Sequence, residues 1–164
     1  MKKFSKTVAI ALLTVLILQP AAFAAEEPKQ PPKPTEGIES TDPNHGSSKE
    51  FDTQMPLRGD SLIQSFYCSI DNKETHLYCE GYTGAFKLAD EIRLYLYLQK
   101  WNGSKWVDIK SWNYKEYDVQ DMEEGENYTG YQHGFYYRVR SEHYIKIGSE
   151  SETQNTASTY IYIP

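Results

Sequence analysis

The segment 129–144, TGYQHGFYYRVRSEHY, gathers side chains that could perform acid–base or metal chemistry. It contains two histidines, His133 and His143, two arginines and a glutamate. Histidine is the side chain best suited to general base catalysis or metal binding near neutral pH. If both lie along one strand, ten residues at about 3.3 Å each place them too far apart to share a metal ion. We therefore predict no metal site and no cofactor.

Nucleophilic catalysis would need a serine or cysteine beside a base. No serine stands in a recognisable elbow motif, although a Ser-His-Asp arrangement is defined by geometry and not by order along the chain. The two cysteines, Cys68 and Cys79, could form a disulfide, or one could act as a free catalytic thiol. A secreted chain favours the disulfide. We predict that the protein is not an enzyme.

Alternation assigns the residues of the same segment to the two faces of a strand, because successive side chains of a strand point in opposite directions. In the strand predicted over 135–140, Phe135 and every second residue after it face the core. Tyr136, Arg138 and Arg140 then form the outer face.

Further strands are predicted over 62–70, 75–79, 91–101 and 105–114, and the segment 84–91 is predicted to form at most one or two helical turns. Tyr95 and Tyr97 point outward from the third of these strands, and parity places Trp106 and Trp112 together on the outer face of the fourth. Short alternating strands at even spacing predict an all-β sandwich or barrel.

The first two strands carry the cysteines. A hairpin centred between Lys73 and Glu74 would place Cys68 opposite Cys79 on one face. A cross-strand disulfide there would contribute about 2–3 kcal/mol, because its loop is short.

The acidic segment 116–126 contains no basic residue. Its spacing differs from that of the helix–loop–helix calcium motif, so we predict a solvated loop in preference to a calcium site.

The first 60 residues differ in composition from the rest of the chain. Residues 1–24 combine early lysines, a short apolar run and small residues before a cleavage site between Ala24 and Ala25, which is typical of a secretory signal peptide. Because of this signal peptide, we expect a secreted, extracellular protein. The style of the peptide suggests a Gram-positive bacterium as its source. Residues 25–60 are rich in Pro, Glu, Ser and Lys and are predicted to form a disordered linker. Residues 61–164 would form one folded domain.

The charge of the chain argues against nucleic acid as a partner. Removal of the signal peptide takes away three lysines and no acidic residue, which changes the formal net charge from −6 to −9. An acidic protein is poorly suited to neutralise phosphates. No second hydrophobic segment follows the signal peptide, so we expect no membrane attachment after cleavage.

The segment from Thr129-Gly130-Tyr131 through His133-Gly134 to Tyr137-Arg138-Val139 resembles the strand–corner–strand motif of fibronectin type III and immunoglobulin-like domains. The tail IGSESETQNTASTYIYIP resembles their final loop and strand. The resemblance implies a two-sheet antiparallel sandwich of about seven strands over residues 61–164. The corner proline of that family is absent, and the cysteines lie on its first two strands. The combination YLQKWNGSKWVDIKSW…GFYYRVRSEH is also similar to a group of small secreted Gram-positive bacterial proteins, which implies export and fold but no activity.

In a sandwich of this family, the outer face of one sheet would bring together aromatic and arginine side chains from four strands. They are Tyr95, Tyr97, Trp106, Trp112, Tyr136, Arg138, Arg140, Tyr160 and Tyr162. Such residues stabilise a sheet by cross-strand packing, and they also dominate binding surfaces. The functional hypothesis is a non-enzymatic binding module for an extracellular protein or a cell-wall glycan. The alternative is a secreted inhibitor or immunity factor that acts on an extracellular enzyme or toxin through its loops, with segment 116–126 as the contact.

Overall fold

The computed structural model describes residues 31–49 and 60–164, which form nine β-strands and no helix. The strands are β1 (His45–Ser47), β2 (Ile63–Asn72), β3 (Leu77–Ala89), β4 (Glu91–Trp101), β5 (Trp106–Glu116), β6 (Val119–Tyr128), β7 (Phe135–Ile147), β8 (Glu150–Ala157) and β9 (Ile161–Ile163). The predicted signal peptide with its cleavage site at Ala24 and Ala25 lies outside the described residues, as do residues 25–30 and 50–59 of the predicted linker. Within the described part, no helix is long and apolar enough to cross a membrane.

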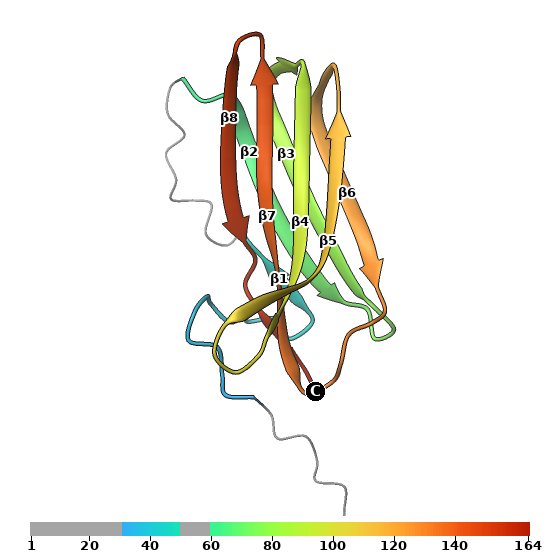
Figure 1. Ribbon diagram of the computed structural model, residues 1–164. Helices are drawn as coiled ribbons and strands as arrows, with labels where there is room; N and C mark the ends of the chain where they lie inside the picture. The colour runs from blue at the N-terminus through green and yellow to red at the C-terminus, as the bar shows by residue number, and fades with distance from the viewer. Residues whose placement is uncertain (1–30, 50–59) are drawn as a thin grey trace, which may run out of the picture.

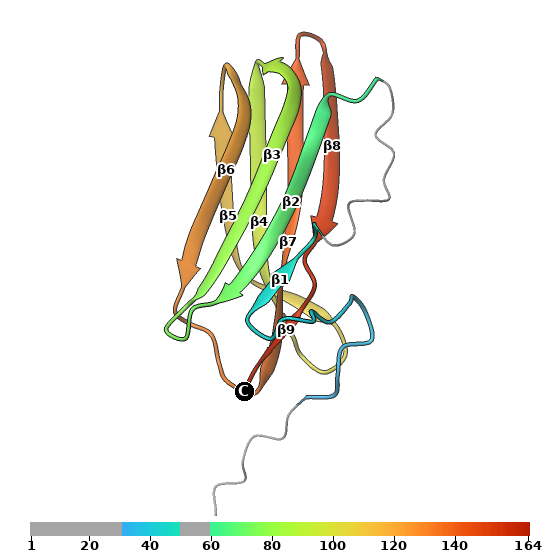
Figure 2. The same cartoon turned by 180° about the vertical axis from the view of Figure 1, so that it is seen from behind.

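The strands form two antiparallel sheets that face each other (Figures 1 and 2). One sheet has the order β1-β2-β3-β6, and the other has the order β5-β4-β7-β8 with β9 paired to β7. The predicted all-β sandwich is therefore confirmed, with nine described strands in place of about seven. Three of these strands were not predicted: β1, which is short, β8, which is almost entirely polar, and β6, where a solvated loop was expected.

The core lies between the sheets and follows the alternation of the strands. On β4, Ile92, Leu94, Leu96 and Leu98 are all 0% exposed, whereas the residues between them reach the outer face or its edge. Tyr137 and Val139 of β7 are also fully buried, as predicted. The period of two places one set of side chains in the core and the other outside it.

The hairpin between β2 and β3 differs in register from the sequence prediction. Its turn is displaced by one residue, because Glu74 adopts a φ of 65° and its N–H donates to Asn72 Oδ1. Cys68 therefore lies opposite Gly81, and Cys79 lies opposite Ile70. Both cysteines still face the core, since a displacement of one residue at the turn shifts every pair by two and preserves parity. The structure does not contain the expected disulfide: both thiols are free and buried.

We expect both thiols to be unreactive in the folded protein. Burial raises the pKa of the Cys68 thiol to about 11, and burial raises the pKa of Cys79 as well, so little thiolate is present at pH 8. Ellman's reagent should label neither cysteine until denaturant is added. The mass of the intact protein should be the same with and without reductant, and a mass that rises on reduction would show that a disulfide does form.

A β-bulge in β5 changes which of its tryptophans reach the outer face. Leu98 pairs with Lys110 but the next residue, Gln99, pairs with Asp108, so Ile109 is an extra residue. An extra residue reverses the parity of the strand beyond it. Trp106 remains on the outer face, but Trp112 lies opposite Leu96 and packs against the main core. The prediction that both tryptophans share the outer face is therefore wrong for Trp112.

Two segments that were expected to be irregular are strands. Residues 84–91 form no helical turn, because β3 continues to Ala89 with an irregularity between Gly84 and Ala89. The acidic segment 116–126 is a loop only at residues 117 and 118: Glu116 ends β5, and residues 119–126 belong to β6, which pairs with β3. Met122 of β6 is buried. Carboxylates suit such a strand because β6 lies at the edge of its sheet, where charge opposes pairing with other chains.

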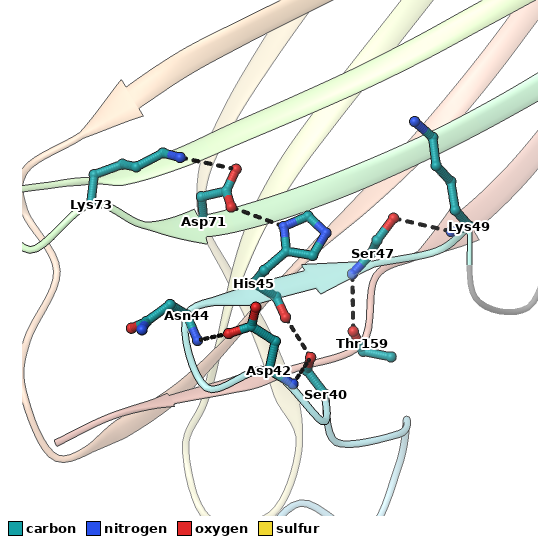
Figure 3. Close-up of polar contacts among 9 residues, drawn as sticks. All are labelled: Ser40, Asp42, Asn44, His45, Ser47, Lys49, Asp71, Lys73 and Thr159. Carbon is teal, nitrogen blue, oxygen red and sulfur yellow. Dashed lines mark hydrogen bonds and ion pairs between the residues drawn. The ribbon is translucent and has the colours of Figure 1, made fainter.

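Residues 31–49 pack against the domain, so the expectation of a disordered linker is wrong for this part of it. β1 pairs with β2, and Ser47 N donates to Thr159 Oγ1 over 2.9 Å, which links β1 to the segment between β8 and β9 (Figure 3). His45 Nδ1 lies 2.9 Å from Asp71 Oδ1. These residues are held by polar and backbone contacts with distant strands, which a composition poor in apolar residues does not reveal.

Candidate functional site

The outer face of the sheet β5-β4-β7-β8 carries a stacked pair of side chains at its centre. Tyr97 on β4 lies opposite Arg140 on β7, and the Arg140 Cζ atom is 3.8 Å from the centre of the Tyr97 ring. Asp108 of β5 holds the same guanidinium, with 3.4 Å between Arg140 Nη2 and Asp108 Oδ2. The side chains of Arg140 and Asp108 are 33% and 45% exposed, so a ligand can reach this pair.

Hydrogen bonds extend from this pair along the sheet. Gln99 Nε2 donates to Asp108 Oδ1 over 2.7 Å, and Arg138 Nε donates to Gln99 Oε1 over 2.7 Å. Arg138 Cζ lies 4.4 Å from the centre of the Trp106 ring. Burial lowers the pKa of the Arg138 guanidinium, and the charge of Glu36 opposes that shift. The face therefore presents donors, acceptors and rings in positions that are set before a ligand binds.

Two residues that the sequence reasoning missed extend this face toward the other end of the sheet. Arg93 of β4 lies opposite Tyr144 of β7, and the Arg93 Cζ atom is 4.9 Å from the centre of the Tyr144 ring. Glu91 accepts a hydrogen bond from Arg93. Continued alternation would have found both, since Arg93 lies two residues before Tyr95 and Tyr144 lies four after Arg140. We call the surface formed by these arginines and tyrosines the Tyr/Arg face: Arg93, Tyr95, Tyr97, Arg140 and Tyr144.

The remaining predicted residues, apart from Trp112, gather at the opposite end of the same sheet. Tyr136 and Tyr160 are 5% and 3% exposed. They form an aromatic cluster whose members are Trp101, Trp106, Tyr136, Tyr160 and Tyr162. The rings of Trp101 and Trp106 are 5.4 Å apart, and those of Tyr136 and Tyr160 are 5.7 Å apart. This part of the predicted surface is not open, in contrast to the expectation of one continuous exposed face.

Residues 31–40, which we call the N-terminal arm, lie against the aromatic cluster. The indole nitrogen of Trp101 donates to the carbonyl oxygen of Pro32 over 2.8 Å, and that of Trp106 donates to the carbonyl oxygen of Glu36 over 2.9 Å. Figure 1 shows the arm in blue beside the loop that leads into β5. The nine predicted site residues are thus divided: some lie on the Tyr/Arg face, others lie at the arm, and Trp112 faces the core.

His133 and His143, the two histidines of segment 129–144, lie in different parts of the fold. His133 lies in the exposed loop before β7, where its Nδ1 contacts the carbonyl oxygen of Pro164. His143 is 0% exposed in the core, with Nδ1 2.7 Å from Thr83 Oγ1 and Nε2 2.7 Å from Ser141 Oγ. Burial lowers the pKa of His143 to about 3. Both ring nitrogens have hydroxyl partners, so His143 is a satisfied core residue. Among the described residues, no group of three or more His, Cys, Asp or Glu side chains could hold a metal ion.

Comparison with known proteins adds no further information. No protein family model, no curated protein and no solved structure matches this chain. Its function must therefore be argued from its own surface.

Proposed function

We propose that this protein is a secreted, non-enzymatic binding module that recognises an extracellular glycan or protein through its Tyr/Arg face. The observation that carries the proposal is the stacking of Arg140 on Tyr97, with Asp108 holding the guanidinium from the neighbouring strand. Tyrosine and arginine dominate the binding energy of interfaces. Their ordered arrangement here reduces the entropy that a ligand must overcome. The bacterial, extracellular setting rests on the signal peptide that the sequence predicts over residues 1–24.

We also propose that the sandwich belongs to the fibronectin type III and immunoglobulin-like group. The order β2-β3-β6 opposite β5-β4-β7-β8 supports this, because it corresponds to strands A, B and E opposite C′, C, F and G. A second support is Tyr137, near the start of β7. Its hydroxyl donates to the carbonyl oxygen of Gln132 over 3.0 Å and accepts from the Gln132 N–H over 2.8 Å, as in the tyrosine corner of those domains. β1 would then be an addition at the edge of the A strand.

The inhibitor hypothesis has less support. Its proposed contact, the acidic segment 116–126, is mostly the paired strand β6 and offers only a two-residue turn as a loop. We therefore keep the Tyr/Arg face as the proposed recognition surface.

The test is a comparison of the wild-type protein with the double variant Tyr97→Ala, Arg140→Ala on glycan arrays, cell-wall preparations and secreted protein fractions. We expect the double variant to lose at least about tenfold in affinity, because truncation of an interface hot spot costs about 2 kcal/mol or more. Lys87→Ala, at an exposed position of β3 in the other sheet, is the control. Arg138 is a poorer choice than Arg140, since the arm lies against it. If every interaction of the wild type persists in the double variant at full strength, the Tyr/Arg face is structural only.

A further inference from the structure

The N-terminal arm has the composition of a peptide ligand. Pro31, Pro32 and Pro34 fix their own φ angles, and each proline favours an extended conformation in the residue before it. Such segments adopt the polyproline II conformation and lose little entropy on binding. Domains that recognise proline-rich peptides use aromatic surfaces for this purpose. The arm and the aromatic cluster have these two complementary chemistries.

The contacts between them follow a regular spacing. The two indole nitrogens of Trp101 and Trp106 bind carbonyl oxygens four residues apart, those of Pro32 and Glu36. Between these anchors Pro34 is buried. The Pro32 carbonyl lies in the irregular start of the arm and the Glu36 carbonyl lies in a bend over residues 35–37, so both are available to the indole N–H groups.

A glycine completes the pattern at the end of the arm. Gly37 has a φ of +89°, and a Cβ atom at this position would lie 2.9 Å from an Nη atom of Arg138. The same Cβ would lie 3.6 Å from the Tyr160 ring. The left-handed backbone conformation at this position therefore favours glycine, and a larger residue would also displace the Arg138 guanidinium. Residues 32–37 read Pro-Lys-Pro-Thr-Glu-Gly, which gives the pattern P-x-P-x-x-G.

We propose that the aromatic cluster is a binding site for extended, proline-rich peptides of the pattern P-x-P-x-x-G in other proteins, and that the arm occupies this site in cis. This site is separate from the Tyr/Arg face, so the inference goes beyond the proposed function. A partner peptide must compete with the arm. The fraction of molecules with an open site sets its apparent affinity, because binding to a minor state is weakened in proportion to that fraction.

Gly37→Val tests this directly, because it displaces the arm without changing a residue of the aromatic cluster. Full-length wild-type and variant chains would be titrated by calorimetry with the synthetic peptide PPKPTEGIES, which corresponds to residues 31–40. We expect Gly37→Val to bind the peptide at least about tenfold more tightly than the wild type does. Thr35→Val, at an exposed arm position, is the matched control and should behave as the wild type. Adding Trp106→Ala to Gly37→Val should abolish binding.

A second variant and a protease assay test independently whether the arm is released. Pro34→Asp removes the buried proline and should release the arm independently, and cleavage after Glu36 by a glutamate-specific protease reports that release. The proposal is overturned if the peptide fails to bind either variant after the arm is released, or if the wild type binds it equally well. A concentration-dependent dimer of the wild type that Trp106→Ala abolishes would also overturn it, because the arm would then belong in the site of a second copy.

Discussion

Acidification from pH 7 to pH 5 is expected to lower the free energy of unfolding by about 2 kcal/mol, because the buried His143 cannot accept a proton in the folded state. Its pKa is about 3 in the folded protein, as burial disfavours the charged ring, and its ordinary value is 6.5. The unfolded chain therefore binds a proton that the folded chain does not. The contribution of His143 to the free energy of unfolding is fully present above pH 6.5. It declines by about 1.4 kcal/mol per pH unit as the pH falls toward 3.

Urea denaturation at half-unit steps between pH 7.5 and pH 5 measures this slope. In His143→Gln the slope should be close to zero, because glutamine can still bond to Thr83 and Ser141 but does not titrate. His133→Gln, which removes an exposed histidine, is the control and should keep the wild-type slope. NMR gives an independent measurement on the unmodified protein: the ring resonances of His143 should not shift in this pH range. A ring that titrates near pH 6 in the folded protein would contradict the expectation.

Gly81→Val is expected to destabilise the protein by about 3 kcal/mol, at the upper end of the range for overpacked cores. Gly81 is fully enclosed at the point where β3 faces β4 across the sandwich. A Cβ atom there would lie 2.7 Å from Leu96 Cδ2 and 3.1 Å from Leu94 Cδ1. Both leucines are 0% exposed, so neither can move into solvent. The sheets must separate locally or the leucines must leave their preferred rotamers.

A double-mutant cycle distinguishes overpacking from loss of glycine flexibility. Leu96→Ala alone should destabilise the protein by about 2–5 kcal/mol through the cavity that it leaves. Combined with Gly81→Val, it should cost at least about 1 kcal/mol less than the sum of the two changes, since valine then fills space that leucine vacated. Additive effects would show that the clash with Leu96 is not the cause. Asn155→Val, at an exposed position of β8, serves as the control for introducing a β-branched residue into a strand.

The strand faces could be predicted because they depend on local alternation. Burial of one face repeats every two residues, so Leu94 and Val139 were assigned to the core, and Tyr97 and Arg140 to the outer face, without knowledge of their neighbours. The bulge at Ile109 shows the limit of this reasoning. Nothing near that residue distinguishes a bulge from regular pairing, and one inserted residue moved Trp112 from the predicted recognition surface to the core.

The candidate site was predicted only in part for the same reason. Its centre, Tyr97 and Arg140, follows from parity. The closed aromatic cluster does not, because the arm that covers it comes from the far end of the sequence. A contact between Pro32 and Trp101 costs loop-closure entropy that only the complete fold offsets, and composition alone favours disorder in such a segment.

By itself, the sequence determined an all-β chain whose strands each bury one face, because the alternation of side-chain types decides which face avoids water. The tertiary structure decided the pairing. The turn at Glu74 set a register in which Cys68 and Cys79 are not opposite each other. The acidic residues of β6 pair with β3 as an edge strand. The docked arm divided one expected aromatic surface into an open Tyr/Arg face and an occupied cluster. The turn depends on a local hydrogen bond from Glu74 to Asn72, whereas the other two outcomes depend on hydrogen bonds between residues distant in sequence, whose small energies no local pattern records.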